Sequence, residues 1–98
     1  MVDKKLSNPK TRQTLILLKQ ELEKTQTSDE NERTTILHLI GDIQELINHI
    51  EKDTPLIRQT NQRLSERLRK AAVLFEVSYP TLASVIEKTL DTLDSSGI

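Results

Sequence analysis

The clearest pattern in the chain is a regular spacing of aliphatic residues between positions 36 and 50. These residues recur at alternating steps of three and four: Ile36, Leu39, Ile40, Ile43, Leu46, Ile47 and Ile50. Because an α-helix turns by about 100° per residue, this spacing gathers them into one stripe along a helix. An apolar stripe of this length is unstable in water, so we expect other segments of the chain to cover it.

Three further helices are predicted from shorter apolar patterns and from the prolines at Pro9, Pro55 and Pro80. Proline suits the first turn of a helix, where its missing N–H would lack a partner in any case. No segment shows the apolar and polar alternation of a strand. The sequence therefore predicts an all-α fold in a single domain, residues 1–98, with helices at about residues 9–26, 29–52, 55–76 and 80–95.

The expected helix ends carry capping residues. Asn8 and Thr54 precede the prolines of the first and third helices, and both side chains can accept a hydrogen bond from a free backbone N–H. Asp29 and Glu32 have the spacing of a capping box at the start of the second helix. Gly97 is predicted to end the fourth helix in a left-handed conformation.

The second and third helices are predicted to form an antiparallel hairpin, because only a short connection separates them. Folding about this connection pairs positions whose numbers add up to about 107. The pairs are Ile57 with Ile50, Asn61 with Leu46, Leu64 with Ile43, Leu68 with Leu39, and Ala71 with Ile36. Asn61 is the polar exception. We expect its amide to mark the register, to bond a backbone carbonyl or to meet its symmetry mate, and a functional contact is the alternative.

The composition favours an oligomer. Hydrophobic residues make up 35% of the 98 residues, and Phe75 and Tyr79 are the only aromatic ones. Such a chain has a thin, aliphatic core, which self-association would complete. We therefore expect the hairpin to be flanked by the first and fourth helices in a bundle or coiled-coil-like arrangement, as a homo-oligomer with the dimer favoured.

Two groups of residues are candidates for a contact between subunits. Four consecutive apolar residues of the first helix point in all directions: Leu15, Ile16, Leu17 and Leu18. Four uncharged residues of the second helix lie away from its apolar stripe: Leu37, Gly41, Gln44 and Asn48. Gly41 costs about 1 kcal/mol in a helix interior relative to alanine. A close helix contact there is one interpretation, and tolerance of glycine on a solvated face is the other.

Charge and cysteine content narrow the function classes. The net charge is −1, which argues against a protein that coats nucleic acid or an anionic membrane. The absence of cysteine excludes disulfides and suits the cytoplasm. The apolar runs are too short to span a bilayer, so no membrane contact is expected. The segments 1–26, 27–53, 54–78 and 79–98 carry net charges of +3, −5, +3 and −2, so neighbouring helices should attract each other.

One face of the second helix is a candidate metal site. It carries four potential ligands at steps of four, three and four: His38, Asp42, Glu45 and His49. One straight helix cannot surround an ion, however, and the hairpin register places three basic residues beside this face: Arg63, Arg67 and Lys70. We therefore expect Asp42 to pair with Arg67. Glu45 should pair with Arg63 in the same way, which leaves metal binding as the weaker interpretation.

The basic stripe Arg63, Arg67 and Lys70 could instead meet phosphates. It has no interleaved aromatic residues, an acidic neighbouring helix and no helix-turn-helix signature, so nucleic-acid binding is an alternative rather than the main prediction. The chain also lacks the glycine-rich phosphate loop, the nucleophile elbow, the metalloprotease motif and the dinucleotide fingerprint. We expect neither an enzyme nor a cofactor.

Three stretches resemble a known family. They are Phe75–Leu82, the ending Ser96-Gly97-Ile98, and Leu39–Ile43 with Leu46-Ile47. Together they resemble a family of small bacterial proteins described only as a domain of unknown function. The resemblance covers most of the chain after Leu15 and implies a bacterial, cytoplasmic, all-helical protein. It supplies no activity, cofactor or site residue.

The sequence thus predicts a structural or regulatory interaction module that associates with itself, and a further protein partner stays open. A nucleic-acid-associated regulator that uses the basic stripe is the second hypothesis. A metal-binding protein is the third.

Overall fold

The computed structural model describes residues 9–94, and these residues form four helices and no strand. The helices are α1 (Pro9–Lys24), α2 (Glu30–Lys52), α3 (Ile57–Phe75) and α4 (Pro80–Asp94). The all-α prediction is therefore confirmed. None of the four helices has both the length and the apolar character needed to cross a membrane.

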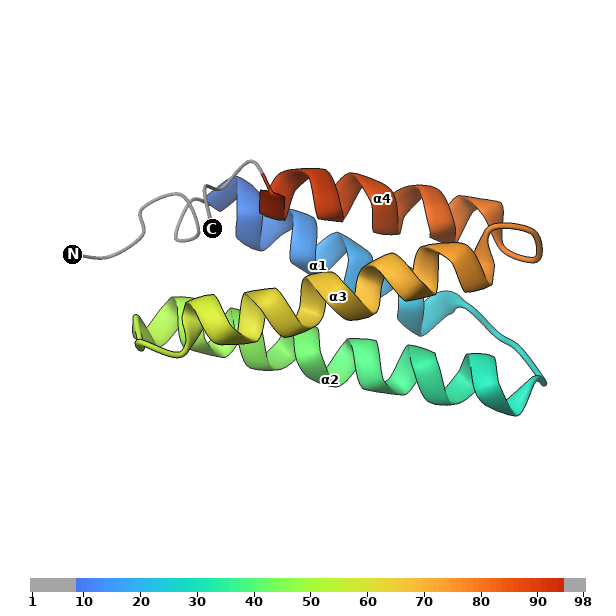
Figure 1. The fold of residues 1–98 in the computed structure, drawn as a ribbon, viewed down its shortest axis with the longest axis horizontal. Helices are drawn as coiled ribbons and strands as arrows, with labels where there is room; N and C mark the ends of the chain where they lie inside the picture. Colours follow the sequence, from blue (N-terminus) through green and yellow to red (C-terminus); the bar gives the residue numbers. More distant parts are fainter. Residues whose placement is uncertain (1–8, 95–98) are drawn as a thin grey trace.

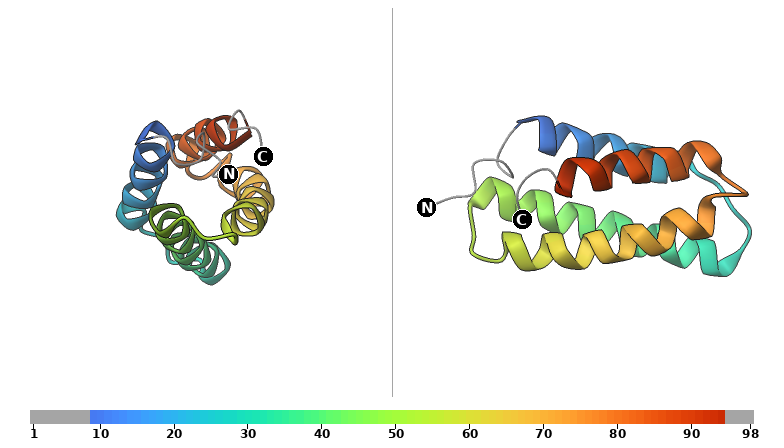
Figure 2. Two further views of the ribbon diagram at one scale, coloured as in Figure 1. Left: turned by 90° about the vertical axis from the view of Figure 1, so that its left-hand side faces the viewer. Right: turned by 45° about the horizontal axis from the view of Figure 1, so that its top comes forward.

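The helices run up and down around one central axis (Figure 1). Seen along that axis they form a ring, in which each helix packs between two others (Figure 2). α2 packs against α1 and α3, and α4 packs against the same two helices on the far side of the ring. The predicted antiparallel hairpin of α2 and α3, flanked by α1 and α4, is confirmed and takes the form of a four-helix bundle.

The core lies along the axis and is built from the apolar faces of all four helices. From α2 it takes Ile36, Leu39, Ile43, Leu46 and Ile50, with Ile40 and Ile47 partly buried against them. The largest buried side chains from the other helices are Leu15, Leu18, Leu22, Leu64, Leu68, Phe75, Leu82 and Ile86. Asn61 is buried among them at 3% exposure, and within residues 9–94 its Oδ1 accepts no hydrogen bond. A buried acceptor without a partner lowers stability, so the amide is not there to strengthen the core.

The start of α2 follows the predicted capping residues. Asp29 is the N-cap, and its Oδ1 accepts the backbone N–H of Glu32 at 2.9 Å. The Glu32 side chain reaches the cap residue through Thr27. The Thr27 hydroxyl donates to Glu32 Oε1 at 2.6 Å and accepts the Asp29 N–H at 3.1 Å. α2 ends at Lys52, and the following C-cap residue Asp53 adopts the left-handed conformation (φ 56°) that lets the chain turn back toward α3.

Two predicted helix ends were wrong by two residues. α1 ends at Lys24 rather than at 26; the backbone N–H of Thr25 still donates to the Glu21 carbonyl at 3.2 Å, and residues 25–29 form the connection to α2. α3 begins at Ile57 rather than at Pro55, because residues 54–57 form a turn closed by the Ile57 N–H and the Thr54 carbonyl.

The predicted cap of α3 was also wrong. Leu56 occupies the cap position and offers no side-chain hydrogen bond, while the Thr54 hydroxyl accepts the Leu56 N–H at 3.3 Å within the turn. α3 ends at Phe75, one residue before the predicted end, and Tyr79 precedes α4. The predicted caps Asn8 and Gly97 and the predicted last residue of the fourth helix, at position 95, lie outside the described residues.

Candidate functional site

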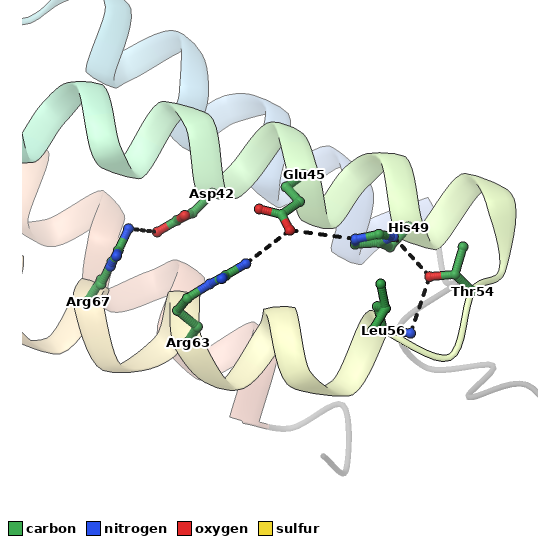
Figure 3. A network of polar contacts seen from close by, with 7 residues as sticks. All are labelled: Asp42, Glu45, His49, Thr54, Leu56, Arg63 and Arg67. Carbon is green, nitrogen blue, oxygen red and sulfur yellow. Dashed lines mark hydrogen bonds and ion pairs between the residues drawn. The ribbon is translucent and has the colours of Figure 1, made fainter.

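The side of α2 that faces α3 carries a line of polar contacts (Figure 3). Asp42 Oδ2 accepts a hydrogen bond from Arg67 Nη1 at 2.7 Å, and Glu45 Oε2 accepts one from Arg63 Nη2 at 3.0 Å. Both ion pairs are those that the hairpin register predicted. We call Asp42, Glu45 and His49 the charged flank of α2.

His49 joins this flank to the loop between α2 and α3. Its Nε2 lies 3.7 Å from Glu45 Oε2, and its Nδ1 lies 2.9 Å from the Thr54 hydroxyl. The same hydroxyl accepts the backbone N–H of Leu56, so the imidazole stabilises the turn that precedes α3. One feature of the sequence favours this contact, because a histidine in the last turn of a helix lies close to a hydroxyl just beyond it.

The four predicted metal ligands do not converge on one point. Within residues 9–94, no three histidine or carboxylate side chains come together as ligands of an ion. Asp42 and Glu45 face guanidinium groups, and His49 faces a hydroxyl. His38 is exposed and lies near Arg67 and Lys70, in a cleft between α2 and α3. Two of the four potential ligands are thus occupied by cations, which repel a metal ion.

The basic stripe of α3 is only partly available to an anion. Arg63 and Arg67 are held by carboxylates of α2, and a phosphate would have to compete with those carboxylates. Lys70 has no ion-pair partner in the part of the chain that the structure describes. Among the three basic residues, the free positive charge is therefore concentrated at Lys70.

A second exposed surface of α2 carries uncharged residues. Leu37, Gly41, Gln44 and Asn48 are all exposed, and we call them the uncharged flank. A Cβ built on Gly41 meets no atom within 4 Å, so glycine is not required there for packing within the chain. Among residues 9–94, no helix makes the predicted close contact with Gly41. A contact between Gly41 and another chain stays a prediction.

A groove of about 400 Å³ runs beside the uncharged flank, between α2 and the C-terminal half of α1. Its apolar lining consists of Leu22, Ile36, Leu37 and Ile40. Leu37 is 61% exposed at the rim of the groove. Sequence reasoning found Leu37 as an uncharged position but missed the groove, since the groove depends on how α1 packs against α2.

The four apolar residues of α1 divide between the core and the surface. Leu15 and Leu18 are fully buried in the bundle, so they are not available to another subunit. Ile16 is 38% exposed and Leu17 is 61% exposed. Ile16 lies one turn after Arg12, whose guanidinium pairs with Glu51 of α2 at 3.4 Å. Because residues four apart share a side of a helix, Ile16 borders the α1–α2 surface.

The loops at one end of the bundle are joined by a contact that the sequence did not reveal. The Tyr79 hydroxyl donates to the backbone carbonyl of Gln26 at 3.1 Å, and its ring packs edge-on against Phe75 at 5.9 Å between centroids. Tyr79 thereby ties the α3–α4 connection to the α1–α2 connection.

Comparison with known proteins gives one match. A family model described as a domain of unknown function (DUF4404) matches residues 11–98, which include both flanks of α2. No curated protein and no solved structure matches the chain.

Proposed function

The chain belongs to the DUF4404 family, a domain of unknown function, and we propose from its surface that it is an interaction module that forms a homodimer through the uncharged flank of α2. This role is non-catalytic and needs no cofactor. A bacterial, cytoplasmic setting belongs to the same proposal.

The observation that carries the proposal is the exposed apolar side chain of Leu37 at the rim of the α1–α2 groove. Ile40 beside it is only partly buried, and Ile16 is a further exposed apolar residue on the α1–α2 surface, outside the groove lining. Exposed apolar groups that gather next to a groove favour association, because burying them removes apolar surface from water.

A second copy of the chain is the occupant that the charges favour. In a two-fold dimer, residues near the axis meet their own copies or close neighbours, so charged residues there repel each other. The uncharged flank spans eleven steps along α2, which is about 16 Å at 1.5 Å per residue. The outward surfaces of α3 and α4, by contrast, carry charged residues: Arg58, Glu66, Arg69, Glu87, Lys88 and Asp91.

The two other hypotheses have less support. Nucleic-acid binding would use Arg63, Arg67 and Lys70, but two of these side chains already pair with carboxylates. Metal binding would use the charged flank, where arginines lie next to the carboxylates. Neither hypothesis accounts for the exposed apolar residues beside the groove.

Light scattering after size-exclusion chromatography tests the dimer directly. The chain has a mass of 11.2 kDa, and we expect twice this mass at micromolar concentrations and above. Gly41→Lys should convert the dimer to a monomer, because it places a charge next to the same charge of the second copy. The substitution should leave the helical content unchanged, since nothing in the chain lies within 4 Å of the added Cβ.

Ser84→Lys is the matched control, because Ser84 is exposed near the middle of α4, on the far side of the ring from α2. Ser84→Lys changes the net charge of the chain by the same amount as Gly41→Lys does, and it should leave the dimer intact. A wild-type monomer at millimolar concentration would refute the proposal. So would a Gly41→Lys variant that keeps the mass of the dimer.

A further inference from the structure

A second hollow lies on the other side of α2, between α2 and α3, with a volume of about 270 Å³. Its apolar floor is lined by Leu39, Ala71 and Leu74, of which Leu39 and Ala71 are buried and Leu74 is partly exposed. Ala71 faces the apolar stripe of α2 with a small side chain. One turn earlier in α3 the corresponding residue is Leu68, and two turns earlier it is Leu64. In Figure 1 the end of α3 is farther from α2 than its start is, so the small side chain and the diverging axes together leave the space.

The rim of this cleft is basic. Three side chains with N–H donors stand around it, His38, Arg67 and Lys70, and no carboxylate is among the lining residues that the structure describes. This is unexpected beside α2, because the segment 27–53 has a net charge of −5. The hydroxyl of Thr35, which also lines the cleft, donates to the Asn31 carbonyl at 2.9 Å.

Each rim residue keeps donors for a ligand. Arg67 uses Nη1 for Asp42, and a guanidinium has five N–H donors in all. The side chains of Lys70 and His38 form no hydrogen bond or ion pair with any other residue in the range 9–94. The carboxylate of Asp42 offsets the charge of Arg67, so the uncompensated charge at the rim is that of Lys70.

We propose that this cleft binds a small organic anion, namely a carboxylate that carries a short aliphatic chain. The chain would lie against the partly exposed Leu74, and the carboxylate would accept hydrogen bonds from Lys70, His38 and Arg67. With a volume of about 270 Å³, the cleft has room for a small organic ligand. A single carboxylate matches the single uncompensated charge, whereas a bare phosphate would leave the apolar floor uncovered.

Hexanoate, with eight non-hydrogen atoms, is a suitable probe. Titration of the ¹⁵N-labelled full chain should give saturable amide shifts that map to Thr35, His38, Lys70 and Leu74. Acetate has the charge without the chain, and hexan-1-ol has the chain without the charge. Both should bind more weakly than hexanoate.

Charge removal at the rim provides the decisive variant. Lys70→Gln should raise the dissociation constant for hexanoate about threefold to fivefold, which is the range of an exposed ion pair. Lys88→Gln on α4 removes the same charge far from the cleft and should leave the constant unchanged. Ala71→Leu fills the floor and should abolish the shifts; the Lys70→Gln result stands independently if this variant packs poorly.

Several outcomes would overturn the proposal. Shifts that do not saturate, equal binding of hexanoate and acetate, or equal weakening by Lys70→Gln and Lys88→Gln would each do so. The two proposals have separate measurements, the mass of the assembly for the dimer and the saturable amide shifts for the anion site. Failure of the dimer and failure of the anion site are therefore distinguishable.

Discussion

The two flanks of α2 differ in how completely the chain itself satisfies them. On the charged flank, Asp42 and Glu45 each meet an arginine of α3, and His49 meets Thr54. On the uncharged flank, Leu37 stands exposed and Gly41 faces open space. Both flanks belong to the same helix and border the same apolar stripe.

The difference shows where a partner is still needed. The exposed carboxylate of Glu45 remains well solvated, and the largely buried carboxylate of Asp42 is compensated by Arg67, so the charged flank is satisfied within the chain. Exposed apolar residues and an interior glycine both cost free energy, and nothing in the described bundle compensates for them. The flank that resembles a functional site because of its titratable groups is thus explained by the fold, and the flank without chemistry is the one that is not.

The largest expected effect is a difference in stability between two leucine-to-alanine substitutions, one in the buried stripe of α2 and one on its uncharged flank. Leu39→Ala should lower the free energy of unfolding by about 2–5 kcal/mol, because Leu39 is fully buried. Leu37→Ala, two residues earlier, should change it by less than about 0.5 kcal/mol at concentrations where the chain is monomeric. Urea denaturation measures both. A loss of several kcal/mol at Leu37 that does not depend on protein concentration would contradict the assignment of this residue to the surface.

The next effect concerns how much the two ion pairs of the charged flank contribute to the free energy of unfolding. A double-mutant cycle of Asp42→Ala and Arg67→Ala should give a coupling free energy of about 1 kcal/mol, because the Asp42 side chain is only 10% exposed. The same cycle for Glu45 and Arg63 should give about 0.2–0.5 kcal/mol, since both side chains are nearly half exposed. The reverse order of the two couplings would show that burial does not determine the strength of these pairs.

The third effect distinguishes the two interpretations of Gly41. Within one chain, Gly41→Ala should raise the free energy of unfolding by about 0.5–1 kcal/mol, because alanine favours the helix and meets no neighbouring atom. Thermal unfolding in dilute solution measures this gain. If the gain turns into a loss at high concentration, then the methyl group meets a second chain. A loss in dilute solution would mean that the backbone at Gly41 is constrained in a way that the bundle does not show.

Much of the fold followed from spacing alone. The three- and four-residue steps on α2 and α3 predicted two helices, their antiparallel pairing and the register that joins Asp42 to Arg67. These predictions succeeded because the apolar stripe and the charged positions agree on the same register. Pro55 was misleading, because proline suits the second position of a turn as well as the first turn of a helix.

The candidate sites were less accessible to sequence reasoning. The run from Leu15 to Leu18 contains no periodicity, so the sequence could not tell that Leu15 and Leu18 are buried while Ile16 and Leu17 are exposed. Nothing in the spacing around Ala71 indicated a cleft, because its volume depends on the angle between α2 and α3. Tyr79 and Gln26 are 53 positions apart, and only the packing of two loops brings them together.

The helices, the hairpin and the ion pairs could therefore be predicted from the sequence, because they depend on residues that recur at short intervals. The exposure of individual apolar residues and the positions of the groove and the cleft became known only from the packing of the four helices. Those outcomes depend on how helices distant in the sequence pack, and the same side chain is core or surface according to whether a neighbouring helix covers it.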